Sequence, residues 1–294
     1  MANLKEIKTR IGGVQKTRQI TSAMKLVSGA KMSRAVANAT AAMPYQQQLS
    51  AVLQRVGEAA GESVDNPLLK SHPEVKRVLI AVLTTDRGLC GGFNNQLLRQ
   101  LVTRRQELKG QNLDVDIVVF GRKAQDFLRN RNVPVLDATI NYGRTDKMDL
   151  VRPFAELAET GFVEGTYDEV WLAYNHYVNT ITQEPTFQKV LPLEMDAAEA
   201  EASGGDDMLE MTFEPSPAAL LDSLLPLYLR TLILQAFLET EAGEHAARMT
   251  AMDNATRNAS DIIGALTLEY NRARQAAITT QIIEIVSGAE ALEG

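Results

Sequence analysis

Residues 244–294 read EHAARMTAMDNATRNASDIIGALTLEYNRARQAAITTQIIEIVSGAEALEG, and this stretch decides the fold. It contains no proline, and residues that favour helices dominate it. Apolar side chains recur at steps of three and four, which predicts one apolar stripe along a helix; they are Ile262, Leu266, Tyr270, Ala273, Ala277, Ile278, Ile282, Ile285 and Ala289. Residues 244–260 hold few large apolar side chains, so this helix needs a partner.

The predicted partner lies at the other end of the chain. Residues 1–57 show the same helical period, first at Leu4, Ile7, Ile11 and Val14 and then, after a stutter, at Ile20, Met24 and Val27. At a rise of about 1.5 Å per residue, this helix would be roughly 85 Å long and a helix over residues 226–287 roughly 90 Å. We expect the two to close on each other as an antiparallel coiled coil. The pair Gly12-Gly13 costs about 2 kcal/mol of helix propensity, so contacts from outside should support that turn.

Composition describes a soluble, folded chain. Its 294 residues are 45% hydrophobic and 23% charged, and their number suggests about two structural units. A single cysteine, Cys90, excludes an internal disulfide and a cysteine-based zinc site and suits a reducing compartment. The apolar run at residues 224–238 is interrupted by Pro226, Arg230 and Gln235, so we predict no membrane span, and the first residues lack the apolar core of a signal peptide. The chain is therefore expected in a cytoplasm-like space.

The middle of the chain alternates between strand and helix patterns. Predicted strands cover residues 77–85, 114–121, 133–140 and 167–178, and a fifth, near 186–193, should pair antiparallel with the fourth. Predicted helices cover residues 94–109, 122–131 and 149–164. The fold class is thus α/β, with a Rossmann-like domain inserted between two long coiled-coil helices. The expected parts are a helix at 1–60, the α/β domain at 74–195, an acidic loop at 196–217 and a helix at 218–294 that Ser216 and Pro217 begin.

Charge is distributed unevenly. Residues 1–34 hold eight basic side chains against the single acidic Glu6, whereas residues 190–222 hold nine acidic side chains and no Lys or Arg, in a chain whose net charge is −7. A basic helix can be an ordinary solvated face, or it can face an acidic partner such as a protein, a nucleic acid or a membrane surface.

The segment DRGLCGGFN, residues 86–94, follows the first predicted strand, at the edge of a sheet where ligands often bind. It matches neither GxxxxGK[ST] nor GxGxxG, the two glycine patterns that hold phosphates. A tight structural turn built on Gly88, Gly91 and Gly92 is therefore favoured over a phosphate site.

Other candidate chemistry is weak. Cys90 has no histidine obviously placed to activate it, so buried packing is favoured. Glu241 and His245 lie four residues apart, as metal ligands on a helix would, but no second such pair completes a site. The pair Asp206-Asp207 lies in the acidic loop, a poor place for acid–base work. We predict no catalytic residue, no cofactor and no metal.

Three long motifs resemble the gamma subunit of rotary, proton-driven ATP synthases of the bacterial type. They are IKTRIGGVQKTRQITSAMKLVSGAKMSRA near the start, DRGLCGGFN after the first strand, and the stretch from Glu244 to Ala289 at the end. The resemblance spans the whole chain in order. Gln281 stands where the family's C-terminal signature has a Glu, whereas Glu284 is kept, and thiol control is not implied because Cys90 is the only cysteine.

The resemblance implies a function and a set of partners. The coiled coil would be a central shaft inside a ring of alpha and beta subunits, and the α/β domain would stand below it with epsilon on the membrane ring of c subunits. Chemistry would stay on beta, on the cytoplasmic side of the bacterial inner membrane. By resemblance, contacts with beta fall to Met24, Lys25, Arg248, Arg274, Gln275 and Thr279, and an apolar bearing holds Ile282, Ile285 and Val286.

Two other classes of protein remain as alternatives. One is a nucleotide- or flavin-binding enzyme that uses the α/β domain, which a bound ligand would favour and the missing phosphate motif disfavours. The other is a coiled-coil tether that binds nucleic acid through residues 1–34, which steeply salt-dependent DNA binding would favour. The basic helix lacks the aromatic residues that stack on bases.

Overall fold

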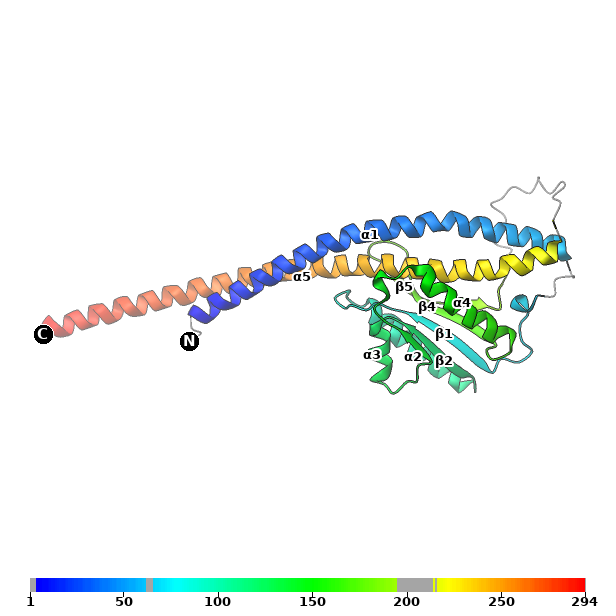
Figure 1. Ribbon diagram of the computed structural model, residues 1–294. Coiled ribbons are helices and arrows are strands. Elements are labelled where there is room, and N and C mark those ends of the chain that lie inside the picture. Colours follow the sequence, from blue (N-terminus) through cyan, green and yellow to red (C-terminus); the bar gives the residue numbers. More distant parts are fainter. Residues whose placement is uncertain (1–3, 62–65, 195–213, 215, 294) are drawn as a thin grey trace. The chain divides into compact units, whose positions relative to one another are not determined.

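The computed structural model describes residues 4–61, 66–194, 214 and 216–293, and these form two units. One unit holds residues up to Gly29 together with those from Arg248, and the other holds residues from Ala30 to Ala247. Two long helices, α1 (Leu4–Ala60) and α5 (Pro217–Glu293), contribute residues to both units (Figure 1). The predicted acidic loop at 196–217 lies almost entirely outside the described residues, and the predicted domain limits stay a prediction.

The second unit contains a five-stranded sheet in the order β3-β2-β1-β4-β5. Strands β1 (Arg77–Leu83), β2 (Asp114–Phe120), β3 (Asp137–Thr139) and β4 (Glu169–Tyr177) are parallel to one another. Strand β5 (Gln183–Leu191) pairs antiparallel with β4, as predicted. Its Pro185, which has no N–H to donate, is tolerated because β5 is an edge strand. The α/β fold class is confirmed.

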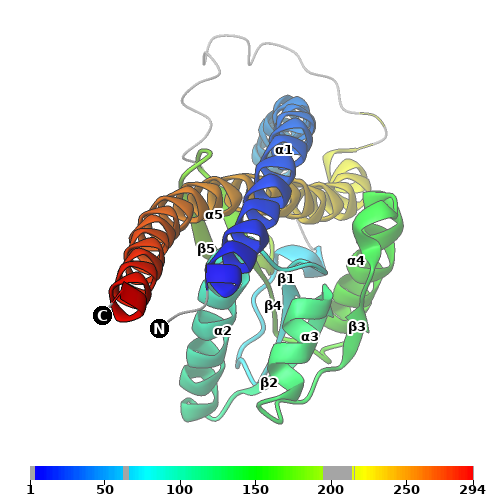
Figure 2. The ribbon, with the colours of Figure 1, turned by 90° about the vertical axis from the view of Figure 1, so that its left-hand side faces the viewer.

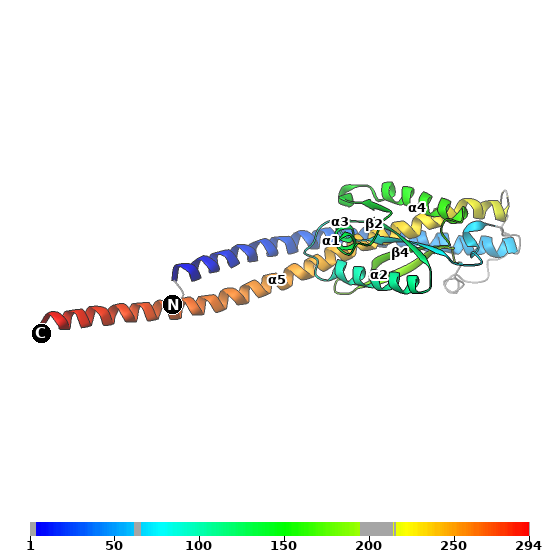
Figure 3. The same cartoon turned by 90° about the horizontal axis from the view of Figure 1, so that it is seen from below.

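Helices cover both faces of this sheet because β1 is apolar on both. Val78, Ile80 and Val82 pack against α2 (Phe93–Gly110) and α3 (Arg122–Arg129), which lie side by side (Figure 2). The alternate residues, Leu79, Ala81 and Leu83, face the cluster that α4 (Lys147–Val163) and α5 complete. Figure 3 shows α4 and α2 on opposite sides of the strands.

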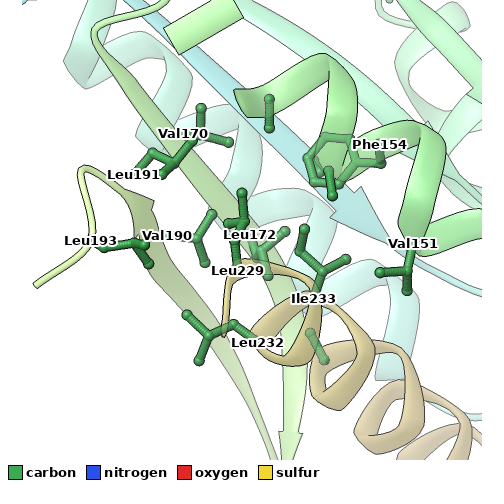
Figure 4. Packing of buried hydrophobic residues seen from close by; sticks show 14 of the residues in the cluster. Val151, Phe154, Val170, Leu172, Val190, Leu191, Leu193, Leu229, Leu232 and Ile233 are labelled. Atoms are coloured by element: carbon green, nitrogen blue, oxygen red, sulfur yellow. The ribbon is translucent and has the colours of Figure 1, made fainter. Parts of the chain in front are cut away.

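Helix α5 begins where its sequence indicates. Ser216 Oγ accepts the Ala219 N–H at 3.3 Å, and Pro217 occupies the first helical position, where its missing N–H costs nothing. By length and composition alone α5 is apolar enough to cross a membrane. In the structure, however, Leu229, Leu232 and Ile233 of its apolar run are buried against β4 and β5 (Figure 4). Each buried side chain of this size stabilises a fold by about 1.5–3 kcal/mol, so the run forms the domain core.

Hydrogen bonds to Asp168 hold the segment that leads into β1. Asp168 Oδ1 lies 2.8 Å from His72 Nδ1, and Asp168 Oδ2 accepts the N–H groups of Lys76 and Arg77 at 2.7 and 2.8 Å. The His72 ring also stacks on Phe162, with ring centroids 4.7 Å apart. Burial raises the pKa of Asp168, but the His72 contact and the two backbone donors outweigh it, so the pKa of this carboxyl lies below its ordinary value.

Replacing Asp168 with Asn should lower the free energy of unfolding by about 1–3 kcal/mol at pH 7, because the charge is lost and one of the three donors to the carboxylate loses its acceptor. Since the folded pKa is depressed, this stabilisation is present above the unfolded pKa of about 3.9 and is lost as pH falls through the folded value. Thermal unfolding followed by circular dichroism, with the exposed Glu156→Gln as control, should show a wild-type chain that is more stable than Asp168→Asn at pH 7, by a difference that shrinks below pH 4. An advantage independent of pH would contradict the role of the ionised carboxylate.

Candidate functional site

The turn after β1 is closed by side chains of the protein itself. Asn94 Oδ1 accepts the Thr85 N–H at 3.1 Å, and its Nδ2 donates to Thr85 Oγ1 at 2.8 Å. Asn175 Nδ2, at the end of β4, donates to the Phe93 carbonyl at 3.2 Å. These bonds span the edge between β1 and β4, where a Rossmann-like sheet would hold a ligand.

The glycines of this turn differ in what they require. Gly91 has a φ of 59°, a left-handed conformation that favours glycine, whereas Gly88 and Gly92 do not lie in that region. A Cβ at Gly92 would come within 3.1 Å of Gln96 Nε2, and one at Gly88 would make an ordinary contact with Lys123. Leu89 also has a left-handed φ, 64°.

The neighbouring positions that could hold a phosphate are filled as well. Asp86 Oδ1 accepts the N–H of Arg122, at the start of α3, and the N–H of Asn141, so a carboxylate already occupies the place of an anion. Helix α5 passes so close that a Cβ at Gly243 would lie 2.8 Å from Phe93 Cε2. The geometry therefore disfavours the nucleotide-binding alternative.

Two further candidates have ordinary structural surroundings. Cys90 is buried, and its Sγ accepts a hydrogen bond from Asn94 Nδ2 at 3.2 Å. Glu241 forms an ion pair with Lys147 at 3.1 Å. Within residues 4–61, 66–194 and 216–293, no three His, Cys, Asp or Glu side chains gather as metal ligands. Asp206 and Asp207 lie outside the described residues.

In the other unit, the first part of α1, up to Gly29, pairs with the part of α5 that begins at Arg248. Lys25 Nζ lies 2.6 Å from Asp253 Oδ1, and Thr256 Oγ1 donates to Thr21 Oγ1 at 2.8 Å. A Cβ at Gly29 would lie 3.2 Å from Met249 Sδ. From Gly29 through Lys25 to Thr21 the residue numbers on α1 decrease, while those of their partners on α5 increase from Met249 through Asp253 to Thr256. The two helices therefore run antiparallel. The Lys25 hydrogen bond, helped by Arg257, holds the pKa of Asp253 below its ordinary value.

One part of the predicted stripe on α1 is wrong. Ile20 and Val27 are 60% and 58% exposed, while Thr21 and Ser28 are buried. The inward side chains repeat every seven residues without a stutter, at Ile7, Val14, Thr21 and Ser28. A strict seven-residue repeat keeps one face toward the partner, and here that face changes from apolar to small and polar.

Predicted side chains on α5 are also mostly outside the seam. Leu266 is buried, but the stripe residues Ile262, Ile278, Ile282 and Ile285 are 49%, 47%, 56% and 71% exposed. The pairing register explains the last three, because α5 extends beyond the start of α1 among the described residues (Figure 1 and Figure 3). The overhang, residues 276–289, thus carries an apolar surface that no other described part of the chain covers.

The expected beta contacts fall into two groups on this unit. Met24 and Lys25 are half-buried and Arg248 is buried at 8% exposure, which places them close to the seam. Arg274, Gln275 and Thr279 are exposed, about 39 to 47 Å further along α5 from Arg248 at 1.5 Å per residue. The expected bearing residues, Ile282, Ile285 and Val286, are all more than half exposed and lie on the overhang.

Sequence reasoning missed three exposed apolar side chains on the same unit. Leu26, Leu268 and Ile283 are 71%, 64% and 59% exposed, although Leu26 and Ile283 adjoin residues that were singled out. Their signal was their position outside the seven-residue repeat, because an apolar residue outside the seam of a paired helix faces solvent or a further partner.

Comparisons with known proteins agree along the whole chain. The family model described as ATP synthase matches residues 3–292. The ATP synthase gamma chain of Pelotomaculum thermopropionicum is 45% identical over 293 residues, and that of a Geobacter species is 44% identical over 294, each match covering 100% of both chains.

Solved structures share the fold at lower identity. The rotor of the Euglena gracilis mitochondrial ATP synthase is similar with a TM-score of 0.63 and 19% identity, covering 94% of this chain and 98% of that one. A chain from the OSCP/F1/c-ring structure of the same synthase, in another rotational state, gives a TM-score of 0.68 at 19% identity, covering 98% and 94%. Such likenesses show a common architecture.

Proposed function

We propose, since this chain belongs to the family of ATP synthase gamma chains, that its paired helices turn inside a ring of three alpha and three beta subunits. The chain is the non-catalytic central-stalk subunit of a rotary ATP synthase, and catalysis takes place on beta. The shaft couples proton flow through the membrane ring to ATP synthesis because its asymmetry puts each beta site in a different state as it turns.

The observation that carries this proposal is the uncovered apolar overhang. Five large side chains on residues 276–289 are 47% to 71% exposed, namely Ile278, Ile282, Ile283, Ile285 and Val286. An apolar surface of this kind marks a place for a partner. Three of them, Ile282, Ile285 and Val286, would form the bearing in the ring.

The surface of α1 fits the same partner. Its exposed cations Lys8, Arg10, Lys16 and Arg18 suit acidic segments of beta. A Cβ at Gly12 or Gly13 would meet no atom of the described residues within 4 Å, so contacts in this part of the structure do not require glycine there. The missing side chains at Gly12 and Gly13 would let the backbone of another subunit approach closely. Contacts from that subunit would also support this turn of α1, which the two glycines weaken.

We assign the two groups of expected contacts to different levels of the ring. Met24, Lys25 and Arg248 would meet the moving domains of beta, and Arg274, Gln275 and Thr279 would meet beta loops nearer the bearing. Lys25 already holds Asp253, so it would act on beta with that carboxylate beside it.

At its base the chain would bind epsilon and the ring of c subunits, on the cytoplasmic side of the bacterial inner membrane. Membrane contact would be made only through the c ring, and no nucleic acid, cofactor or metal takes part. The acidic segment at residues 194–214 is the expected adaptor, because it is polar and contains glycine and nine acidic side chains gather in residues 190–222.

Deleting residues 197–205 tests the placement of the base. We expect ATP hydrolysis by the soluble alpha–beta–gamma complex to stay near wild type, because the deletion would leave the shaft intact. Attachment to the membrane sector, and inhibition of hydrolysis by blockers of the proton channel, should fall.

The matched control is a Gly/Ser segment of the same length in place of residues 197–205. Loss of hydrolysis in the soluble complex would indicate that this segment lies inside the ring of alpha and beta subunits. Normal attachment to the membrane sector would show that it is not part of the base. Purification of the wild-type complex should give one copy of this chain per hexamer, and any other ratio would contradict a central shaft.

A further inference from the structure

Helix α5 carries a buried carboxylate that the proposed contacts with alpha, beta, epsilon and the c ring leave without a role. Glu239 is 6% exposed, in the first third of α5 and inside the unit that holds the sheet. Its Oε2 lies 2.6 Å from His176 Nδ1 and accepts the Tyr177 N–H at 3.3 Å, while its Oε1 accepts Gln235 Nε2 at 3.0 Å. Two of these partners come from the end of β4, so the carboxylate joins the helix to the sheet.

The same turns of α5 are held from a second direction. Glu241 pairs with Lys147, at the start of α4, at 3.1 Å. At about 100° per residue, Glu239 and Glu241 point to roughly opposite sides of the helix. Gly243, one turn beyond Glu239, lies against Phe93, which Asn175 holds through its carbonyl.

We propose that Glu239 is the positioning residue that fixes the rotation and the height of α5 against the α/β domain, so that torque passes between the domain and the shaft. The inference rests on the proposed function. Apolar contacts lower down, such as those of Leu229 and Ile233, are strong but non-directional. Hydrogen bonds are directional, so this carboxylate resists a turn that an apolar stripe would tolerate.

A shift of α5 against the sheet would be costly, which explains how Glu239 fixes the position of the helix. A shift of α5 by one residue would move it about 1.5 Å along its axis and turn it by about 100°. Glu239 would then be buried without its donors, and an unpaired buried charge is among the most costly defects in a folded protein. One register of α5 is thereby selected.

The test uses Glu239→Ala and the isosteric Glu239→Gln, with the exposed Glu156→Gln on α4 as matched control. Hydrogen exchange of the full chain should rise at the amides of residues 235–243 by about a hundredfold in the alanine variant, less in Glu239→Gln, and not in the control. In the membrane complex, protons pumped per ATP hydrolysed should fall in the same order, while hydrolysis by the soluble complex is kept.

Three results would overturn the proposed role of Glu239. They are unchanged exchange at residues 235–243, an unchanged ratio of protons pumped per ATP in Glu239→Ala, or an equal loss of hydrolysis and pumping, which would indicate general unfolding. If Glu239→Ala fails to fold, Glu239→Gln decides by the same measures. A wild-type complex that hydrolyses ATP without pumping would instead count against the proposed function, and the exchange measurement would still decide whether Glu239 holds α5.

Discussion

Replacing Met24 with lysine is expected to uncouple ATP hydrolysis from proton pumping while leaving assembly and hydrolysis largely intact. Met24 is half-buried beside Lys25, whose ammonium group is engaged with Asp253. A second cation at this level would gain a charge-assisted contact with an acidic loop of beta, which is worth about 1.5–3 kcal/mol. That contact would favour one rotary state over the others by about a factor of ten or more.

Inverted membrane vesicles allow both quantities to be measured on one preparation, as acidification of the lumen and as release of phosphate. Met24→Leu is the control, since it keeps the volume and adds no charge. Met24→Lys with a normal number of protons per ATP would mean that Met24 does not face beta. A loss of the same size in Met24→Leu would point to packing in the seam instead of charge.

Replacing Phe237 with alanine should destabilise the α/β domain by about 3–5 kcal/mol. Phe237 is 1% exposed and meets Phe120 edge-on at 4.9 Å and Tyr142 edge-on at 6.0 Å between ring centroids. Its loss would remove buried area and two aromatic pairs, each worth about 0.5–1.5 kcal/mol beyond that area.

Hydrogen exchange at the amides of β1 should report the free energy of unfolding in the full chain, because the amides of a buried central strand are expected to exchange through global unfolding. Leu227→Ala is the matched control on the same helix, because Leu227 is 37% exposed and should cost far less. Equal losses for the two variants would show that the aromatic cluster is not the centre of the core.

The α/β domain could be predicted from sequence because its pattern is repetitive. A continuous apolar run such as residues 78–83 indicates a strand buried on both faces, and β1 is that strand. The predicted third strand was too long, since only Asp137–Thr139 pair with β2 and Pro134 precedes them. Val133 and Val135 pack against the core but do not belong to the strand. The apolar pattern therefore predicted the packing of these side chains correctly, but not the bounds of the strand.

The shaft was harder to predict because its seam is partly polar. A search for apolar side chains selects Ile20 and Val27, yet Thr21 and Ser28 lie in the seam. The partner helix explains this, because it presents Thr256 and Asp253 to this part of α1. The Thr21 hydroxyl and the Lys25 ammonium group hydrogen-bond with them, which an isoleucine side chain cannot do. Periodicity in one helix cannot show what the other presents. Nor could it show that Ile282 and Ile285 extend past the start of α1.

The antiparallel pairing also imposes an order on folding. Lys25 and Asp253 are 228 residues apart in the chain, and Thr21 and Thr256 are 235 apart. Contacts of such separation carry the largest loop-closure entropy and form late. On the ribosome the sheet can complete its pairing before residues 4–29 meet their partner on α5. Ile7, which is 3% exposed in the folded chain, stays exposed during that time. The first helix made is thus the last to be matched, which makes the nascent chain most open to aggregation or chaperone binding at its N-terminal segment.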